Sequence, residues 1–331
     1  MPIDWSPLVE LVSKRKDFLL TTHVRPDGDG LGSMLALGEI LRERGKKVQM
    51  VVASIIPAQY AFLDPQQTIQ VFHEPDDRHR GADAIVVLDT GTWNQLGSFG
   101  KFMAEAAADK LVIDHHVTQD ELGAKRLVDI SAEATGRLVH EAVLALGGPV
   151  SPRIAHLLFI ALAMDTGWFR HPNTTAASFG LAESLMKEGV RPDQIHQQLY
   201  ERNTLGRLKL MGCALERLQV THQGLTAYTE VRAGDYLATG AVPSDTEDLV
   251  NFPRSLSGVE VGLLFMEQPR GGIKVSFRAR SLVDVARVAE QFGGGGHRLA
   301  SGAIVEGTLP DVQNRVLAAI AAAMPTAESK V

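Results

Sequence analysis

The sequence has a single cysteine, Cys213, among its 331 residues. One cysteine forms no internal disulfide and cannot build a cysteine-rich zinc site, so any metal site must use other ligands. This usage favours a reducing compartment. The N-terminus also lacks the basic-then-apolar pattern of a secretory signal, because acids stand at Asp4 and Glu10. We therefore expect the protein in the cytoplasm.

Long apolar runs are absent as well. The longest mostly apolar run covers residues 154–164, and its 11 residues include His156. A membrane crossing needs ~18 or more apolar residues. We therefore expect this run to form a buried helix, and we expect no membrane partner.

Positive charge is in deficit, since 33 Lys and Arg residues stand against 39 Asp and Glu residues, a formal net charge of −6. Aromatic residues make up only 6% of the chain. Dedicated binders of long DNA usually carry a strongly basic balance, and single-strand channels need aromatic side chains for stacking. This composition argues against long duplex DNA as a partner.

The first half of the chain alternates short apolar runs with helix-length segments. The runs are rich in Val and Ile and stand at 18–22, 48–53, 84–88 and 111–113. A loop at 23–30 and a helix at 31–44 follow the first run. Continuously apolar strands that alternate with helices imply a parallel sheet covered by helices on both faces. We therefore predict an α/β domain at 1–190.

The second half has a different pattern. Helical signal from about residue 134 ends in a periodic stretch at 205–218, which we interpret as part of a connecting helical linker at 191–218. Alternating strands then follow at 225–231, 259–266 and 272–280, with a helix near 283–292. At roughly 150 residues per domain, the length also suggests two domains. We predict a smaller α/β domain at 219–331.

Four places in the first half put Asp or His where a predicted strand or apolar helix ends. They hold His23, Asp27 and Asp29; then Asp89; then Asp114, His115 and His116; and finally Asp165. Each place has an ordinary alternative, since Asp-Gly-Asp-Gly is commonly a turn and an Asp after a strand can cap the next segment. Two adjacent histidines in an extended chain point to opposite sides, so we expect only one of them to face a shared site.

Together these side chains form a set of carboxylate and imidazole ligands at the edge of the sheet where open α/β proteins bind their ligands. Mixed nitrogen and oxygen donors fit Mn²⁺, with Mg²⁺, Fe²⁺ and Co²⁺ as alternatives. Two divalent cations about 3.5–4 Å apart, bridged by a carboxylate, would activate a water and clamp a phosphoryl group. The residue types are therefore compatible with a centre of two divalent cations.

The order His-x-x-x-Asp-x-Asp, Asp, Asp-His-His, Asp-Thr-Gly resembles the DHH phosphoesterase superfamily, named for the tripeptide at 114–116. The resemblance implies one metal held by His23, Asp27 and Asp89, and a second held by Asp29, Asp89, His115 and Asp165. Asp89 would be the bridge. The resemblance also implies catalytic roles for Asp114, which would orient a neighbouring imidazole, and for His116, near the scissile phosphate. A purely structural His116 stays an alternative.

Four consecutive glycines at 293–296 precede His297, and a predicted strand before them carries Arg278. A flexible end to the preceding helix would explain the glycines alone. Glycine amides also allow an anion to approach the backbone closely, and the two basic residues would add charge. The Gly-Gly-Gly-His motif is similar to that of the DHHA1 substrate-binding domain. This implies substrate contacts from Arg278, Gly294, Gly295, Gly296 and His297.

The length leaves no room for the extra nucleic-acid-binding domains of RecJ-type exonucleases, and the chain looks most like the NrnA-type enzymes of this superfamily. That likeness implies hydrolysis of short oligonucleotides (nanoRNA) and removal of the 3′-phosphate from adenosine 3′,5′-bisphosphate (pAp). Two alternatives stay open, a soluble phosphodiesterase of products such as linear pApA and a sensor that binds nucleotides without cleaving them. The sequence also leaves a homodimer open.

Overall fold

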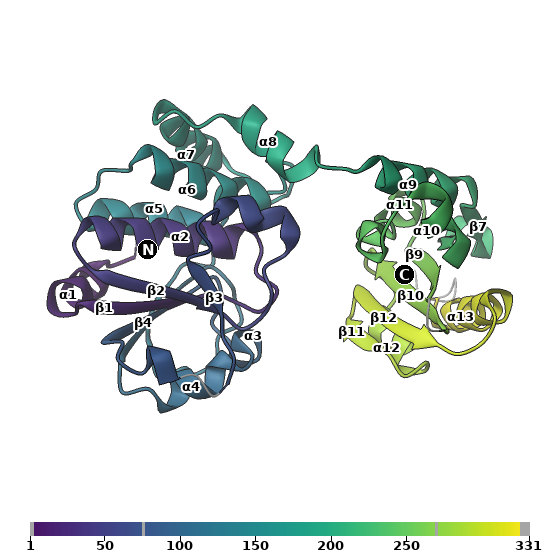
Figure 1. The fold of residues 1–331 in the computed structure, drawn as a ribbon, viewed down its shortest axis with the longest axis horizontal. Helices are drawn as coiled ribbons and strands as arrows, with labels where there is room; N and C mark the ends of the chain where they lie inside the picture. Colours follow the sequence, from purple (N-terminus) through teal and green to yellow (C-terminus); the bar gives the residue numbers. More distant parts are fainter. Residues whose placement is uncertain (1–2, 75–76, 269–270, 325–331) are drawn as a thin grey trace, which may run out of the picture. The chain divides into compact units, whose positions relative to one another are not determined.

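The computed structural model describes residues 3–74, 77–268 and 271–324, and the chain divides into two compact units (Figure 1). Unit 1 is Met1–Glu201 and unit 2 is Arg202–Val331. The stretch 191–218, expected as a helical linker, contains two helices, α8 (Pro192–Tyr200) and α9 (Leu205–Glu216). Ile195 of α8 is buried in the core of unit 1, and Leu210 of α9 is buried in unit 2. The chain therefore passes between the units in the short segment that separates these helices.

Unit 1 contains the expected parallel sheet. Its strands pair in the order β3-β2-β1-β4-β5-β6, and every pair is parallel. The strands are β1 (Asp17–Thr21), β2 (Lys47–Val52), β3 (Ile69–Val71), β4 (Ala84–Leu88), β5 (Asp109–Asp114) and β6 (Lys125–Val128). Of these, β3 and β6 are short edge strands that the apolar pattern did not reveal.

Helices cover both faces of this sheet, which explains why its central strands are apolar throughout. Alternate residues of β4 enter two different cores, with Val86 in one and Val87 in the other. The larger core takes in α1 (Ser6–Lys14), α2 (Gly28–Glu43), α5 (Thr135–Ala145), α6 (Pro152–Asp165) and α7 (Ala176–Lys187). The smaller core lies against α3 (Trp93–Leu96) and α4 (Phe99–Glu105).

Helix α6 contains the apolar run 154–164, and most of it is buried as expected. In the part of the chain that the structure describes, no helix combines the length and the apolar character needed to span a bilayer.

The start of α2 corrects one expectation. The sequence suggested a loop through residue 30, but the helix begins at Gly28, directly after its N-cap Asp27. The Asp27 carboxylate accepts hydrogen bonds from the backbone amides of Asp29, at 3.0 Å, and Gly30, at 3.1 Å. A capping Asp satisfies amides that have no partner within the helix. The two aspartates of the Asp-Gly-Asp-Gly segment therefore belong to a helix start, not to a plain turn.

Unit 2 contains a second, mixed sheet, in the order β11-β12-β10-β9-β8-β7. Strands β8 and β9 pair in parallel, and the other neighbouring strands in this order pair antiparallel. The strands are β7 (Gln219–Thr221), β8 (Thr226–Val231), β9 (Val261–Glu267), β10 (Ile273–Ala279), β11 (Gly295–His297) and β12 (Ala300–Val305). Buried residues of α12 (Val285–Glu290) and α13 (Leu309–Ala323) pack on one face, with α9, α10 (Ala233–Thr239) and α11 (Asn251–Ser255) on the other side.

Candidate metal centre

The candidate centre lies at the carboxyl edge of the unit 1 sheet. Strands β1 and β4 are neighbours there although β2 and β3 come between them in sequence. The strand order reverses direction at this point, and open α/β sheets bind ligands in the crevice that such a reversal creates. His23, Asp27 and Asp29 follow β1, and Asp89 directly follows β4. Sheet topology therefore brings together side chains that are 60 or more residues apart in the sequence.

A first group consists of His23, Asp27 and Asp89, whose ligand atoms lie close enough together to hold one ion. The Nδ1 atom of His23 donates to the Val24 carbonyl at 2.9 Å, which leaves Nε2 facing the carboxylates. Nε2 lies 3.7 Å from Asp27 and 3.5 Å from Asp89. Burial alone would lower the pKa of His23, but the two carboxylates outweigh it and raise that pKa to about 11. The group thus attracts a positive charge strongly.

A second group consists of Asp29, His115 and Asp165. His115 Nε2 lies 4.0 Å from Asp29, 3.6 Å from Asp89 and 3.7 Å from Asp165, in each case measured to a carboxylate oxygen. This nitrogen is buried and has no hydrogen-bond partner among the described residues. A buried polar atom without a partner is costly, and the surrounding oxygens stand too far away for hydrogen bonds. The arrangement fits a divalent cation between them.

Asp89 connects the two groups, because each of its carboxylate oxygens faces a different one. Oδ2 lies 3.5 Å from His23 Nε2, and Oδ1 lies 3.6 Å from His115 Nε2. The side chain is only 3% exposed, and its backbone is left-handed, with φ of 62°. Such a backbone is uncommon outside glycine, Asn and Asp, and it often marks a functional site.

The carboxylates of this centre repel one another in the absence of a cation. Burial raises the pKa of Asp29 well above its usual value, and the nearby charges of Asp89 and Asp165 add to the effect. Burial likewise raises the pKa of Asp165. Carboxylates packed this closely are costly unless a cation neutralises them, and oxygen with imidazole nitrogen is a donor set typical of Mn²⁺ and related ions. The residues therefore fit the divalent ions expected from the sequence.

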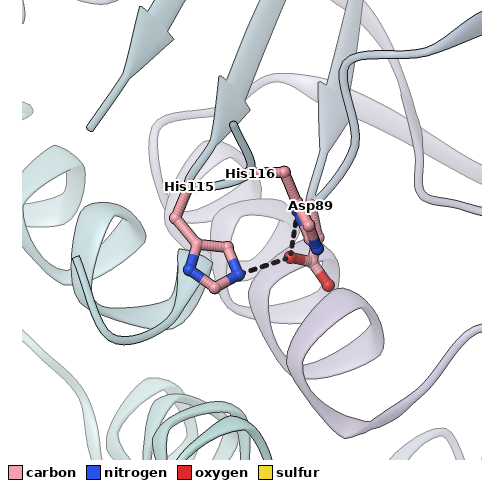
Figure 2. Close-up of side chains that lie close together, drawn as sticks. All are labelled: Asp89, His115 and His116. Carbon is pink, nitrogen blue, oxygen red and sulfur yellow. Dashed lines mark ion pairs between the residues drawn. The ribbon is translucent and has the colours of Figure 1, made fainter. Parts of the chain in front are cut away.

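Both histidines of the Asp-His-His segment face Asp89, contrary to the expectation that only one would do so (Figure 2). The Nδ1 atom of His116 lies 3.8 Å from Asp89, close to the 3.6 Å of His115. The reason is that β5 ends at Asp114, so the side-chain alternation of the strand does not continue through residues 115–116. The Asp114 carboxylate accepts hydrogen bonds from the backbone amides of both histidines and turns the chain.

Asp114 is completely buried, and its Oδ1 also accepts a hydrogen bond from His116 Nδ1 at 2.8 Å. That bond raises the pKa of His116 to about 8, against the opposing effect of partial burial. Gln119 supports the carboxylate from its other side, since Nε2 donates to Asp114 Oδ2 at 2.5 Å. The imidazole of His116 is 53% exposed, so it can meet a ligand from solvent.

Several residues that the sequence pattern does not reveal hold these candidate ligand side chains in place. Thr135 and Gly136, at the start of α5, donate hydrogen bonds to Asp29 and Asp89. The Ala132 carbonyl accepts from His115 Nδ1 at 3.0 Å. Their only sequence signal is a Thr-Gly pair at the start of a helical pattern, which is too common to indicate a site.

Gly30 explains why the first turn of α2 can lie so close to Thr22 and His23. A Cβ atom at this position would lie 2.4 Å from Thr22 Oγ1 and 3.1 Å from His23 Nε2. Glycine therefore serves here to make space for the ligand side chains, not to provide conformational freedom.

In unit 2, sheet register aligns two of the expected substrate-binding residues. Ala300 of β12 pairs with His297 of β11 on one side and with Arg278 of β10 on the other. Residues directly opposite each other in a sheet point to the same face, and two strand spacings amount to about 10 Å. His297 and Arg278 therefore flank a small alanine side chain on one face.

The glycines before His297 have different surroundings. A Cβ at Gly294 would lie 2.2 Å from the Gly302 carbonyl oxygen, and one at Gly296 would lie 2.7 Å from the Ala300 carbonyl oxygen. These two glycines let β11 lie against β12. A Cβ at Gly295 would meet nothing within 4 Å, so packing does not explain a glycine there.

Comparison with known proteins identifies the class. Residues 17–162 match the DHH family, N-terminal domain, and residues 231–325 match the DHHA1 domain. The chain belongs to the DHH family. The family match and the site at the sheet edge together identify it as a phosphoesterase.

The relatives cover nearly the whole chain. The chain is 28% identical to the bifunctional oligoribonuclease and PAP phosphatase NrnA of Bacillus subtilis, over 94% of this chain and 96% of that protein. It is 30% identical to the NrnA protein of Thermus thermophilus, over 91% of this chain and 88% of that protein. A solved exopolyphosphatase-related protein from Bacteroides fragilis shares the fold, with a TM-score of 0.84, 23% identity and coverage of 96% and 95%.

Proposed function

We propose that the protein hydrolyses phosphoester bonds in short oligonucleotides and removes the 3′-phosphate of pAp, with two divalent cations, preferably Mn²⁺. The observation that carries this proposal is the orientation of Asp89, whose two oxygens face two separate groups of His and Asp ligands. The relatives named as bifunctional oligoribonuclease and PAP phosphatase support the choice of substrates.

The proposal assigns ligands as follows. One cation is held by His23, Asp27 and Asp89, and the other by Asp29, Asp89, His115 and Asp165. When bound, such a pair of cations supplies an activated water and a clamp on the phosphoryl group.

His116 acts on the substrate in this proposal. Its Nδ1 donates to Asp114, so Nε2 is the atom available to a phosphate oxygen or a leaving group. The hydrogen bond from His116 to Asp114 raises the pKa of the imidazole and so favours its protonated form. Asp114 orients the ring and stabilises its charge, and Gln119 keeps Asp114 in place.

Unit 2 binds the substrate phosphate in this proposal. Arg278 and His297 flank Ala300 on one face, and Gly294, Gly295 and Gly296 form the adjoining backbone. This patch is short, and the chain around it has a net charge of −6. Long single strands need a continuous basic groove with aromatic side chains, whereas a short patch suffices for one terminal phosphate. We therefore expect substrates of about two to five nucleotides.

The test is a hydrolysis assay on pAp, pApA and a series of oligoribonucleotides from dimer to about 24-mer, with Mn²⁺ and with a chelator. We expect kcat/KM to be highest for the short substrates and to vanish with the chelator. The Asp89→Asn variant should lose both activities, whereas Asp17→Asn, at the opposite end of β1, should keep them. Rates that stay level through the 24-mer, or full activity of Asp89→Asn, would contradict the proposal.

A further inference from the structure

The first turn of α5 touches both ligand groups of the candidate centre, although none of its residues is an expected ligand. The Thr135 hydroxyl donates to Asp89 Oδ1 at 2.8 Å. The backbone amide of Thr135 donates to Asp29 Oδ2 at 2.7 Å, and that of Gly136 donates to Asp29 Oδ1 at 2.9 Å. Thr135 and both carboxylates are buried, so solvent does not weaken these bonds.

Asp29 acts as the cap of α5 from another part of the chain. The N-cap residue of that helix, Ala134, provides no side-chain hydrogen bond. Asp29, on α2, satisfies two of the amides at the helix start instead. The positive end of the helix dipole favours an ionised carboxylate at this position. Oδ2 accepts one of these hydrogen bonds and retains a lone pair for a cation.

The same segment also orients His115. The Ala132 carbonyl accepts from His115 Nδ1 at 3.0 Å, so the lone pair of the neutral imidazole resides on Nε2. A hydrogen bond of this kind sets the tautomer and ring orientation of a metal-ligating histidine. Residues 132–136 thus hold three of the proposed ligands, Asp29, Asp89 and His115.

We propose that Thr135 is a positioning residue that fixes the Asp89 carboxylate between the two ligand groups, an inference that rests on the metal centre of the proposed function. Asp89 Oδ1 faces His115 at 3.6 Å and His116 at 3.8 Å, while Oδ2 faces His23 at 3.5 Å. These orientations depend on the rotation of the carboxylate about χ2, and the hydrogen bond that the Thr135 hydroxyl donates to Oδ1 restrains this rotation. Without that hydroxyl the carboxylate can rotate away from its bridging orientation.

The test compares Thr135→Val, which removes the hydroxyl at nearly constant volume, with Thr135→Ser, which retains it. Mn²⁺ is titrated into the metal-stripped full chain by calorimetry, to measure both stoichiometry and Kd. We expect Thr135→Val to weaken Mn²⁺ binding by about 10–100-fold, the usual effect of losing a group that orients a metal ligand. Thr135→Ser should recover most of the affinity. In turnover, Thr135→Val should lower kcat with little change in KM.

Two further variants separate positioning from general stability. Thr229→Val removes a buried hydroxyl in unit 2 that donates a hydrogen bond to the Ala214 carbonyl. This variant should leave Mn²⁺ binding unchanged. If Thr135→Val does not fold, the pair Thr135→Ser and Thr135→Ala makes the same comparison.

The outcomes distinguish this inference from the proposed function. A wild-type chain that binds no Mn²⁺ would overturn the metal centre itself. A wild-type chain that binds two ions, with a Thr135→Val variant that binds two ions at the same Kd, would overturn only the role of Thr135. A lower melting temperature of Thr135→Val with an unchanged Kd for Mn²⁺ would also overturn the role of Thr135, because the hydroxyl would then only stabilise the fold.

Discussion

At the scale of single residues, different structural constraints act on the four neighbouring glycines at 293–296. Gly293 has a left-handed φ of 73° just after α12, as the end of a helix often requires. A Cβ atom at Gly294 or at Gly296 would overlap backbone atoms of β12. Gly295 has open space beside it and no backbone reason to be glycine. A ligand that approaches the main chain is a physical reason for such a residue.

Substitution of these glycines should therefore separate binding from folding. We expect Gly295→Ala to raise KM for pAp with little change in kcat or melting temperature, because a methyl group would obstruct the phosphate. Gly294→Ala should instead destabilise unit 2 by about 1–3 kcal/mol, since its Cβ would overlap the Gly302 carbonyl. Steady-state kinetics measure KM and kcat of each variant, and thermal melts measure its stability. An unchanged KM in Gly295→Ala would remove this glycine from the substrate patch.

At the scale of elements, one ion pair joins two helices of unit 2. Arg217, which directly follows α9, donates to both carboxylate oxygens of Asp235 on α10, at 2.5 and 2.9 Å. The carboxylate also caps α10 by accepting from the Arg232 amide at 2.7 Å. The hydrogen bonds from Arg217, followed by that from the Arg232 amide, lower the pKa of Asp235 despite partial burial.

Asp235→Asn should therefore cost about 1–2 kcal/mol of stability at neutral pH, a figure typical of a hydrogen bond to a charged group, because the Asp235 side chain is buried while that of Arg217 is 27% exposed. The native pKa lies below the unfolded value of about 3.9, so this stability is present above that value and is lost as the pH falls through the native pKa. Urea unfolding of wild type and variant should converge as the pH falls below about 4. The exposed pair Arg191–Asp193 provides a control, since Asp193→Asn should leave stability nearly unchanged. A difference that persists at low pH would show that the charge is not the cause.

At the scale of the whole molecule, each unit has its own sheet and cores, while the residues of the candidate centre all lie in unit 1. A ligand stabilises the folded region that binds it, by about 2.7 kcal/mol at a concentration 100 times Kd. Calorimetric scans with Mn²⁺ and with a chelator should therefore move one unfolding transition upward by roughly 5–10 °C and leave the other in place.

The Asp235→Asn variant assigns the second transition, because it should lower only the transition of unit 2. A single transition that moves as a whole with Mn²⁺ would contradict independent unfolding of the units. A scan that does not respond to Mn²⁺ at all would contradict the metal centre.

The sequence by itself determined the α/β class and the kind of chemistry. Strands buried on both faces must be apolar throughout, so 84–88 was recognisable as a central strand without any tertiary information. The parallel order of such strands then implied that Asp89 and Asp114 would meet at one edge. Residue types alone favoured nitrogen and oxygen ligands, because one cysteine cannot build a cysteine-rich site.

Only the tertiary structure decided how these residues are held. Asp27 caps α2 and Asp29 caps α5, yet both are Asp residues two positions apart, and nothing local distinguishes them. The distant partner of Asp29, Thr135, lies 106 residues away, and contacts of that range arise from packing of helices, not from sequence pattern. The turn after β5 that brings both histidines to Asp89 likewise depends on the buried Asp114 carboxylate, whose contacts exist only in the folded chain.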